Sequence, residues 1–440
     1  MPEALTAFWN TLGVMTQDIV LLVALLFPAC IIWLVTMRGY ATGPLLRGLM
    51  RRHAGVASVF VALIAISVAI GTGLIAQERA LRQGSAQAAA PFDLIVAAPG
   101  SDVTAMLAAV YLQPARVELV DGAAFDRVWR HENVAMAAPI AFGDSFEGAP
   151  VVGTISAFID HISGDLPEGR MFRRDDEAVA GANARVQIGA TVSPAHGRGD
   201  DAQEGAHGDF AYTVVGRMAP TGSPWDRAIL VPIESVWSIH GLSDGHGPDW
   251  DGRLGPPFDP SAFPGTPAIL VRPQALWATY ALRSEFSDGE TMAFFPGAVL
   301  ARLHGLLGDV RQVMTVLAIV TQVLVGVAVL TGLLILSRLL ARQLALLRAL
   351  GAPNRFVIGL MWAFSSVLVV TGAGLGLGFG VLAAQAISSV VSARTEIAVS
   401  ASLGWPEVHL VAAFVSITVM LALIPACLTM RRGVIEDLRA

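Results

Sequence analysis

Histidine offers the clearest candidate chemistry in this sequence, because its ring nitrogens can bind a metal ion. Seven of the nine His residues lie between Gln77 and Asp309. His240 and His246, on either side of the sequence GLSDG, form the best pair for an ion such as Zn²⁺. No HxH, HxxxH or HExxH spacing occurs and no Cys accompanies these residues, so surface histidines in loops are the favoured interpretation. We therefore predict no metal site, with this pair as the candidate if one exists.

The sequence lacks the residues for nucleotide hydrolysis. Its 29 basic residues are all Arg. A Walker A loop needs a Lys on the nucleotide phosphates, so no P-loop ATPase lies within the chain, and any ATP must be hydrolysed by another polypeptide. The sequence GDSFEG at Gly143–Gly148 has the wrong spacing for a nucleophile elbow. We expect no catalytic residue and no cofactor in this chain.

A basic segment, RLLARQLALLRALGAPNR (Arg338–Arg355), lies between two apolar runs. Arg338 and Arg342 are four residues apart and share a helical face, while Leu residues cover most of the remainder. Gly351 can adopt the left-handed conformation that ends helices, and Pro353 cannot continue one. Such a short helix suits a lever that passes motion between a cytoplasmic partner and the bilayer. An ordinary positively charged loop is the alternative.

Glycines recur at every second position of the apolar run that follows. Gly372, Gly376 and Gly380 fall on one helical stripe of small residues, which is suited to tight packing of helices. The run is not a dinucleotide-binding fingerprint, because Leu375 and Leu377 occupy the positions where the third glycine of that motif would be needed.

The composition indicates that the elements that position these residues are membrane spans. The chain is 54% hydrophobic and 15% charged, with a mean hydropathy of +0.61, which is too apolar for a soluble protein of this size. Cys30 and Cys427 both lie in apolar runs and imply no disulfide framework. Gln77–Asp309 has 29 acidic residues and 16 Arg, whereas the remainder is basic by +7. This division indicates topology and gives no support to nucleic-acid binding.

Five spans follow from the apolar runs and the Arg distribution. The predicted order is an N-terminal span (1–37), a cytoplasmic basic segment (38–53), a span (54–76), an outer domain (77–309), a span (313–337), the cytoplasmic helix (338–355), a span (356–390), a short outer loop (391–407), a span (408–430) and a cytoplasmic tail (431–440). The inner segments hold eleven Arg and two acidic residues, as the positive-inside rule requires. The first run, Ile19–Met37, is just long enough to cross, so an interfacial helix is its alternative. Phe356–Val390 must tilt, break or project beyond the bilayer.

The outer domain reads as a mixture of strands and helices. Strand-like segments are Phe92–Ala97, Val134–Phe142, Pro150–Ile155, Tyr212–Met218, Ala228–Val231 and Ala268–Val271. Helical patterns fill Val103–Leu112, Gly122–Trp129, Ile233–His240 and Gln274–Glu285. We expect an α+β domain, or two lobes that separate near Gly164–Gly181. Trp225, Trp237, Trp250 and Trp277 could line a groove for a lipid or peptide, with core packing as the alternative.

Several segments resemble the FtsX/MacB/LolE family of ABC-transporter permeases, the mechanotransmission type. They are Leu45–Gly71 before the outer domain, Phe92–Ser101 near its start and Leu344–Phe364 at the basic helix. The last contains R-x-LGA, the family's usual inner-loop pattern. Tyr212–Trp237 resembles the periplasmic core domain of MacB-like permeases. The run Ile19–Met37 departs from the family, whose core has four spans.

The resemblance implies a partnership with an ATPase in the bacterial inner membrane. It implies a homodimer, or a pair with a sister permease, bound to two ATPase subunits that hold Mg-ATP, with the large domain in the periplasm. ATP-driven closure would push on the inner loop. The residues that this implication assigns to coupling are Arg338, Arg342, Leu346, Arg348, Leu350, Gly351 and Ala352.

Three functions remain open on the sequence. The favoured one is export or extraction of a hydrophobic or amphipathic cargo, such as a lipid, lipoprotein, peptide or drug. The second is an FtsX-like regulator that activates a periplasmic partner protein without transport. The third is zinc handling through the histidines of the outer domain.

Overall fold

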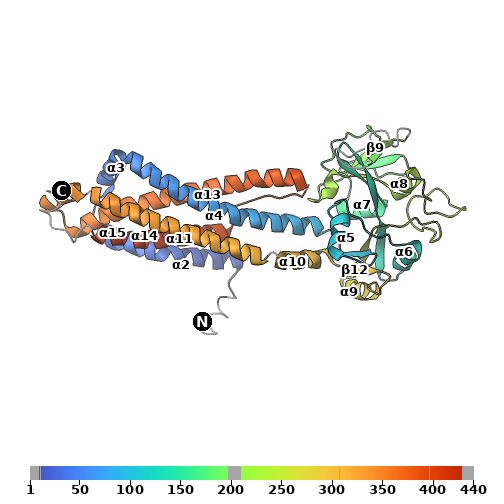
Figure 1. Ribbon diagram of the computed structural model, residues 1–440, viewed down its shortest axis with the longest axis horizontal. Coiled ribbons are helices and arrows are strands. Elements are labelled where there is room, and N and C mark those ends of the chain that lie inside the picture. Colours follow the sequence, from blue (N-terminus) through green and yellow to red (C-terminus); the bar gives the residue numbers. More distant parts are fainter. Residues whose placement is uncertain are drawn as a thin grey trace. The chain divides into compact units, whose positions relative to one another are not determined.

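The computed structural model describes Trp9 and residues 11–196, 210–306, 308–339, 341–395 and 397–428, so the predicted tail 431–440 lies outside the described residues. The contacts divide the chain into two compact units (Figure 1). The helical unit comprises Met1–Leu81, Gly308–Ser389 and Ser400–Ala440. The α/β unit comprises Arg82–Leu307 and Val390–Val399. Along the chain, the α/β unit is thus an insertion between segments of the helical unit.

Four helices are long and apolar enough to cross a membrane. They are α2 (Val14–Met37), α4 (Ala54–Ala89), α13 (Asn354–Thr395) and Trp405–Leu428, which consists of α14 (Trp405–Leu421) and α15 (Leu423–Leu428). They correspond to four of the five predicted spans. The remaining one falls in α11 (Gly308–Leu339), whose described apolar part is Ile319–Ile335. That fifth span stays a prediction.

The first of these helices, α2, packs against α14 at the side of the bundle. All of its residues are described and none of them is buried. His409 of α14 lies 3.0 Å from the Asp18 carbonyl oxygen, and this hydrogen bond joins the two helices. With 24 residues at about 1.5 Å each, α2 exceeds the hydrocarbon thickness of about 30 Å.

Two helices extend well past the ends of their apolar runs. The 36-residue α4 continues from the predicted span end at Ala76 to Ala89, so the helix runs on into the polar region. The 42-residue α13 is one unbroken helix, about 63 Å long at 1.5 Å per residue. By their contacts, α4 from Arg82 and α13 from Val390 belong to the α/β unit.

The α/β unit contains two sheets. The first has the order β12-β1-β11-β2 with antiparallel pairs throughout, and consists of β1 (Leu94–Ala97), β2 (Val134–Pro139), β11 (Ile269–Pro273) and β12 (Met292–Phe294). The second has the order β5-β9-β6-β10-β4-β3-β8, with β7 on β9, and consists of β3 (Ala141–Phe146), β4 (Ala149–Thr154), β5 (Glu168–Gly169), β6 (Glu177–Ala180), β7 (Thr191–Val192), β8 (Ala195–His196), β9 (Tyr212–Arg217) and β10 (Ile229–Pro232). Its pairs β4–β10 and β6–β9 are parallel.

This strand order corrects the alternative of two lobes that separate near Gly164–Gly181. The first sheet takes its strands from both ends of the domain and the second takes them from the middle. Strands β5 and β6 lie within the stretch Gly164–Gly181 and belong to the second sheet, together with β4 before it and β9 after it. One hydrophobic cluster contains residues of both sheets. The domain is therefore interleaved along the chain.

Each predicted segment overlaps an observed element, with one informative exception, whereas helices α7 and α10 and strands β5, β6, β7, β8 and β12 were not predicted. The helices are α5 (Asp102–Ala109), α6 (Gly122–Trp129), α7 (Ser156–Ser163), α8 (Ile233–Ile239), α9 (Leu276–Glu285) and α10 (Pro296–Leu306). Val134–Phe142, expected as one strand, is divided between β2 and β3, which lie in different sheets. At the division the Thr266 hydroxyl accepts from Ile140 N at 3.0 Å and donates to Ile140 O at 2.8 Å. The side chain thereby replaces the strand partners of this residue.

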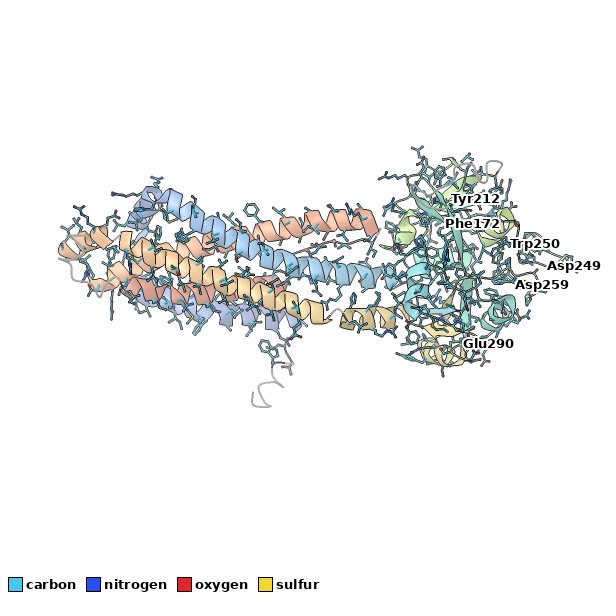
Figure 2. All side chains as sticks on the ribbon, in the orientation of Figure 1. Phe172, Tyr212, Asp249, Trp250, Asp259 and Glu290 are labelled. Carbon is cyan, nitrogen blue, oxygen red and sulfur yellow. The ribbon has the colours of Figure 1, made fainter. Side chains whose placement is uncertain are left out.

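Aromatic side chains fill the core of the α/β unit. Trp225 is fully buried against Phe158, with a ring-centroid distance of 5.1 Å, and Trp237 packs on Phe258 at 5.5 Å. These two tryptophans are core residues, so they cannot line an open groove. Trp250, by contrast, lies in the long loop that follows α8 (labelled in Figure 2). Its ring stacks on that of His246.

One ion pair in this unit makes its stability depend on pH. The Glu177 carboxylate accepts from Arg170 Nη1 and Nη2 at 2.7 and 2.5 Å and from Arg173 N at 2.8 Å. The Glu177 pKa is lowered from 4.5 to about 2, and the largest cause is the hydrogen bond from the Arg170 side chain. A lowered folded-state pKa gives stability that is present above pH 4.5 and is lost as the pH falls toward 2.

We expect Glu177→Gln to lower the free energy of unfolding of the full chain in detergent at pH 7 by about 1–3 kcal/mol, because the charged hydrogen bonds are lost. The melting temperature should fall accordingly. The difference from the unmodified chain should shrink as the pH falls from 7 to 3. Circular dichroism melts at a series of pH values measure this. Glu168→Gln, at an exposed carboxylate on β5, is the control and should change little. A pH-independent difference would contradict the assignment.

Candidate functional site

The basic segment forms a short helix, α12 (Ala341–Ala349), between α11 and α13. The predicted start of this helix at Arg338 is corrected, because α11 extends to Leu339 and α12 begins at Ala341. The range 338–355 also includes the first residues of α13, which begins at Asn354. Arg338 belongs to the last turn of α11. The other residues assigned to coupling are Arg342, Leu346 and Arg348 on α12, and Leu350, Gly351 and Ala352 in the turn after it.

The turn at the end of α12 has the hydrogen bonds of a Schellman motif. Gly351 has a φ of +93°. Its N–H donates to Arg348 O at 3.0 Å, and Ala352 N–H donates to Leu347 O at 3.0 Å. These are the two bonds that close a helix whose last residue is left-handed. The prediction that the helix stops at Gly351 is therefore confirmed.

One face of α12 is buried and the other is exposed. Leu344 and Ala345 are buried, and Leu344 belongs to one apolar cluster with Leu333 of α11 and Val357 of α13. On the opposite face Arg342 is exposed, Leu346 is 50% exposed and Leu350 is 79% exposed. Its buried face is therefore packed closely against both neighbouring helices. Its exposed Leu residues offer an apolar contact to a partner.

The glycine stripe of α13 lies against α4. A Cβ atom added to Gly372 would lie 2.8 Å from Ile64 Cβ, one at Gly376 would lie 2.6 Å from Ala65 O, and one at Gly380 would lie 2.8 Å from Ala69 O. By contrast, no described atom lies within 4 Å of a Cβ added to Gly374 or Gly378. The alternating glycines therefore differ: three allow close approach of the two helices and two do not face a neighbour.

Polar side chains connect the same helices inside the apolar bundle. Gln322 of α11 donates to the Ser67 carbonyl of α4 at 3.3 Å. Ser388 of α13 donates to Gln77 Oε1 of α4 at 3.0 Å. Hydrogen bonds of this kind hold helices together where lipid offers no alternative partner. Together with the glycines they bind α4, α11 and α13 into one body.

A buried ion pair joins α4 to the start of α14. Arg79 Nη1 lies 2.8 Å from Glu407 Oε2, and the Glu407 side chain is 0% exposed. The same oxygen accepts from Gly404 N at 2.9 Å, while Arg79 Nη2 donates to Ser402 O. Position 404 has no room for a side chain, since its Cβ would overlap the Arg79 guanidinium. The sequence analysis did not identify this pair; a Gly–Trp–Pro–Glu helix start was the available signal.

The two candidate metal ligands each lie beside a different carboxylate. His240 Nε2 is 3.5 Å from Asp144 Oδ1, and His246 Nε2 is 3.4 Å from Glu234 Oε1. Glu234 Oε1 also accepts from Gly255 N, so it fastens the long loop to α8. Among the described residues, no group of three or more His, Cys, Asp or Glu side chains could hold a metal ion. The pair is not brought together as a metal site.

Three features of the helical unit are candidates for a functional role. They are an exposed short helix packed on two long ones, close glycine contacts and a buried ion pair. Comparison with known proteins adds nothing to this description: no protein-family model matches the chain and no curated protein matches it.

Proposed function

We propose that this chain is the permease subunit of an ABC transporter of the FtsX/MacB/LolE-like mechanotransmission type. The observation that carries the proposal is α12, whose exposed face bears Arg342 and Leu346 and continues to Leu350 in the turn after it, while its buried face packs with α11 and α13. An ATPase subunit that docks on the exposed face could move both long helices at once. The chain itself has no Lys for a Walker A loop, so ATP and Mg²⁺ belong to two copies of that partner.

The packing supports a path for the motion through the helical unit. Displacement of α12 moves α11 and α13, and the close contacts at Gly372, Gly376 and Gly380 carry α4 with them. Both α4 and α13 continue without a break into segments that belong to the α/β unit. In this proposal a homodimer, or a pair with a sister permease, delivers the stroke to periplasmic domains. Its cargo is a hydrophobic or amphipathic molecule taken from the periplasm or the outer leaflet of the inner membrane.

The proposal predicts that charge reversal on α12 uncouples the partner. An ABC-type ATPase subunit from the same genome is co-expressed with this chain, and copurification and ATP hydrolysis are measured. We expect Arg342→Glu to reduce stimulated hydrolysis by at least about tenfold, because a like charge at an interface costs several kcal/mol. Arg394→Glu, at an exposed position near the other end of α13, is the matched control. Unchanged copurification and hydrolysis in Arg342→Glu would refute the proposed docking face.

A second candidate function, regulation of a periplasmic protein without transport, is favoured by one surface. Leu276, Trp277 and Tyr280 on α9 are 84%, 68% and 68% exposed. Exposed aromatic residues of this size are typical of protein interfaces. Recovery of a single stoichiometric periplasmic protein on the unmodified chain, and its loss with Trp277→Ser, would favour the regulator. Retention of the same protein by both would remove this support.

A further inference from the structure

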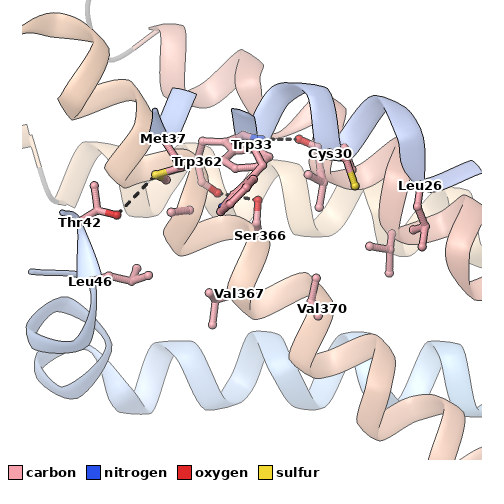
Figure 3. A pocket seen from close by; sticks show the side chains of 14 residues that line it. Leu26, Cys30, Trp33, Met37, Thr42, Leu46, Trp362, Ser366, Val367 and Val370 are labelled. Atoms are coloured by element: carbon pink, nitrogen blue, oxygen red, sulfur yellow. Dashed lines mark hydrogen bonds between the residues drawn. The ribbon is translucent and has the colours of Figure 1, made fainter. Parts of the chain in front are cut away.

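An apolar cavity opens on the helical unit between α2, α13 and α14. Its volume is about 390 Å³, and Leu26, Trp33, Trp362, Val367, Val370 and Val419 are among the residues that line it (Figure 3). Its polar lining is limited to the side chains of Cys30, Thr42 and Ser366. Because α2, α13 and α14 are of membrane-spanning length and composition, this cavity is suited to a hydrocarbon chain.

A second cavity of about 570 Å³ adjoins the first at the end of α2. Trp33 and Met37 line both cavities. The second one adds two guanidinium groups, Arg38 and Arg355, and the phenol of Tyr40. The Tyr40 ring is held in place by an edge contact with Phe356 at 5.5 Å.

The charge of the second cavity is unbalanced within the described part of the chain. Neither Arg38 nor Arg355 has an ion-pair partner among the described residues, and none of the residues that line the two cavities is acidic. Two Arg side chains converge there from segments more than 300 positions apart in the sequence. Paired guanidinium groups match the oxygens of a phosphate. Trp and Tyr favour the depth at which lipid headgroups begin.

We propose that the two cavities together bind one anionic phospholipid. Its phosphodiester headgroup lies between Arg38 and Arg355, and one acyl chain passes Trp33 into the apolar cavity. A nucleotide or a sugar phosphate would leave the apolar cavity without a suitable occupant, whereas a neutral hydrocarbon would leave the two charges unmatched. The lipid also bridges α2 to α13, in addition to the packing of α2 against α14. This site is independent of the proposed transport function.

The test measures lipid contact at Trp33 in nanodiscs of phosphatidylcholine that contain a small fraction of brominated phosphatidylglycerol or brominated phosphatidylcholine. Bromine quenches tryptophan fluorescence on contact, and the difference between the unmodified chain and Trp33→Phe isolates the signal of this residue. We expect brominated phosphatidylglycerol to be favoured about tenfold over brominated phosphatidylcholine, as charge-assisted hydrogen bonds to phosphate predict.

The Arg38→Ala/Arg355→Ala double variant should lose that preference, so that the two lipids quench Trp33 equally. Arg47→Ala/Arg51→Ala, at exposed positions on α3 (Gly43–Arg52) that line neither cavity, should retain it. If brominated phosphatidylcholine quenches Trp33 to the same extent in the double variant and in the unmodified chain, the helical bundle of the variant is intact. Equal quenching in the unmodified chain would overturn the proposal. So would displacement of phosphatidylglycerol by millimolar inorganic phosphate, which would indicate a small-anion site.

Discussion

Arg79→Met is expected to lower the stability of the helical unit by about 3–5 kcal/mol, because it leaves a buried carboxylate without its counter-charge. Glu407 is 0% exposed, and its Oε2 atom lies 2.8 Å from the guanidinium that the substitution removes. The Ser402 carbonyl loses its donor in the same step. Thermal unfolding of the full chain in detergent, followed by circular dichroism, measures the loss.

A double variant separates the charge effect from the loss of packing. In Arg79→Met/Glu407→Met no charge remains buried, and most of the lost stability should return, since apolar replacements of buried ion pairs are often neutral. Arg82→Met, at an exposed position one turn further along α4, is the matched control and should change stability by less than about 0.5 kcal/mol. If Arg79→Met and Arg82→Met behave alike, the ion pair does not hold α14 to α4.

The second large effect is expected at the glycine stripe. Gly376→Ala and Gly380→Ala place a methyl group within 2.6 and 2.8 Å of the carbonyl oxygens of Ala65 and Ala69, and backbone atoms cannot turn aside as a side chain can. Each substitution should cost about 1–3 kcal/mol through overpacking. In the proposed mechanism the pair together should also reduce ATPase stimulation, because α4 and α13 separate.

The same helix provides the control. Gly374→Ala and Gly378→Ala meet no described atom within 4 Å, so they should be neutral or stabilising by about 0.5–1 kcal/mol, the gain expected when Ala replaces Gly in a helix. Melting temperatures of the four single variants, compared in one detergent, give the answer. Equal changes in melting temperature at Gly374, Gly376, Gly378 and Gly380 would show that the contact with α4 does not govern these positions.

The sequence alone was sufficient for features that depend on neighbouring residues. The stop at Gly351 followed from its freedom to adopt a positive φ, and the bounds of α6 at Gly122–Trp129 were predicted to the residue. Four apolar runs indicated helices of spanning length, because the thickness of the bilayer sets the same minimum length of apolar helix for each span. The glycine stripe could be placed on one face of α13 from helical periodicity. Its partner helix could not be named.

Long-range pairings were decided by the tertiary structure. Arg79 and Glu407 are 328 positions apart, and neither residue type nor spacing relates them until α4 and α14 pack side by side. The division of the predicted strand Val134–Phe142 depends on the hydroxyl of Thr266, which lies 126 positions from Ile140. In the same way Arg38 and Arg355 line one cavity only because α2 and α13 meet. Local backbone preferences act over a few residues, whereas buried charge and cavity shape arise from contacts that the finished fold alone creates.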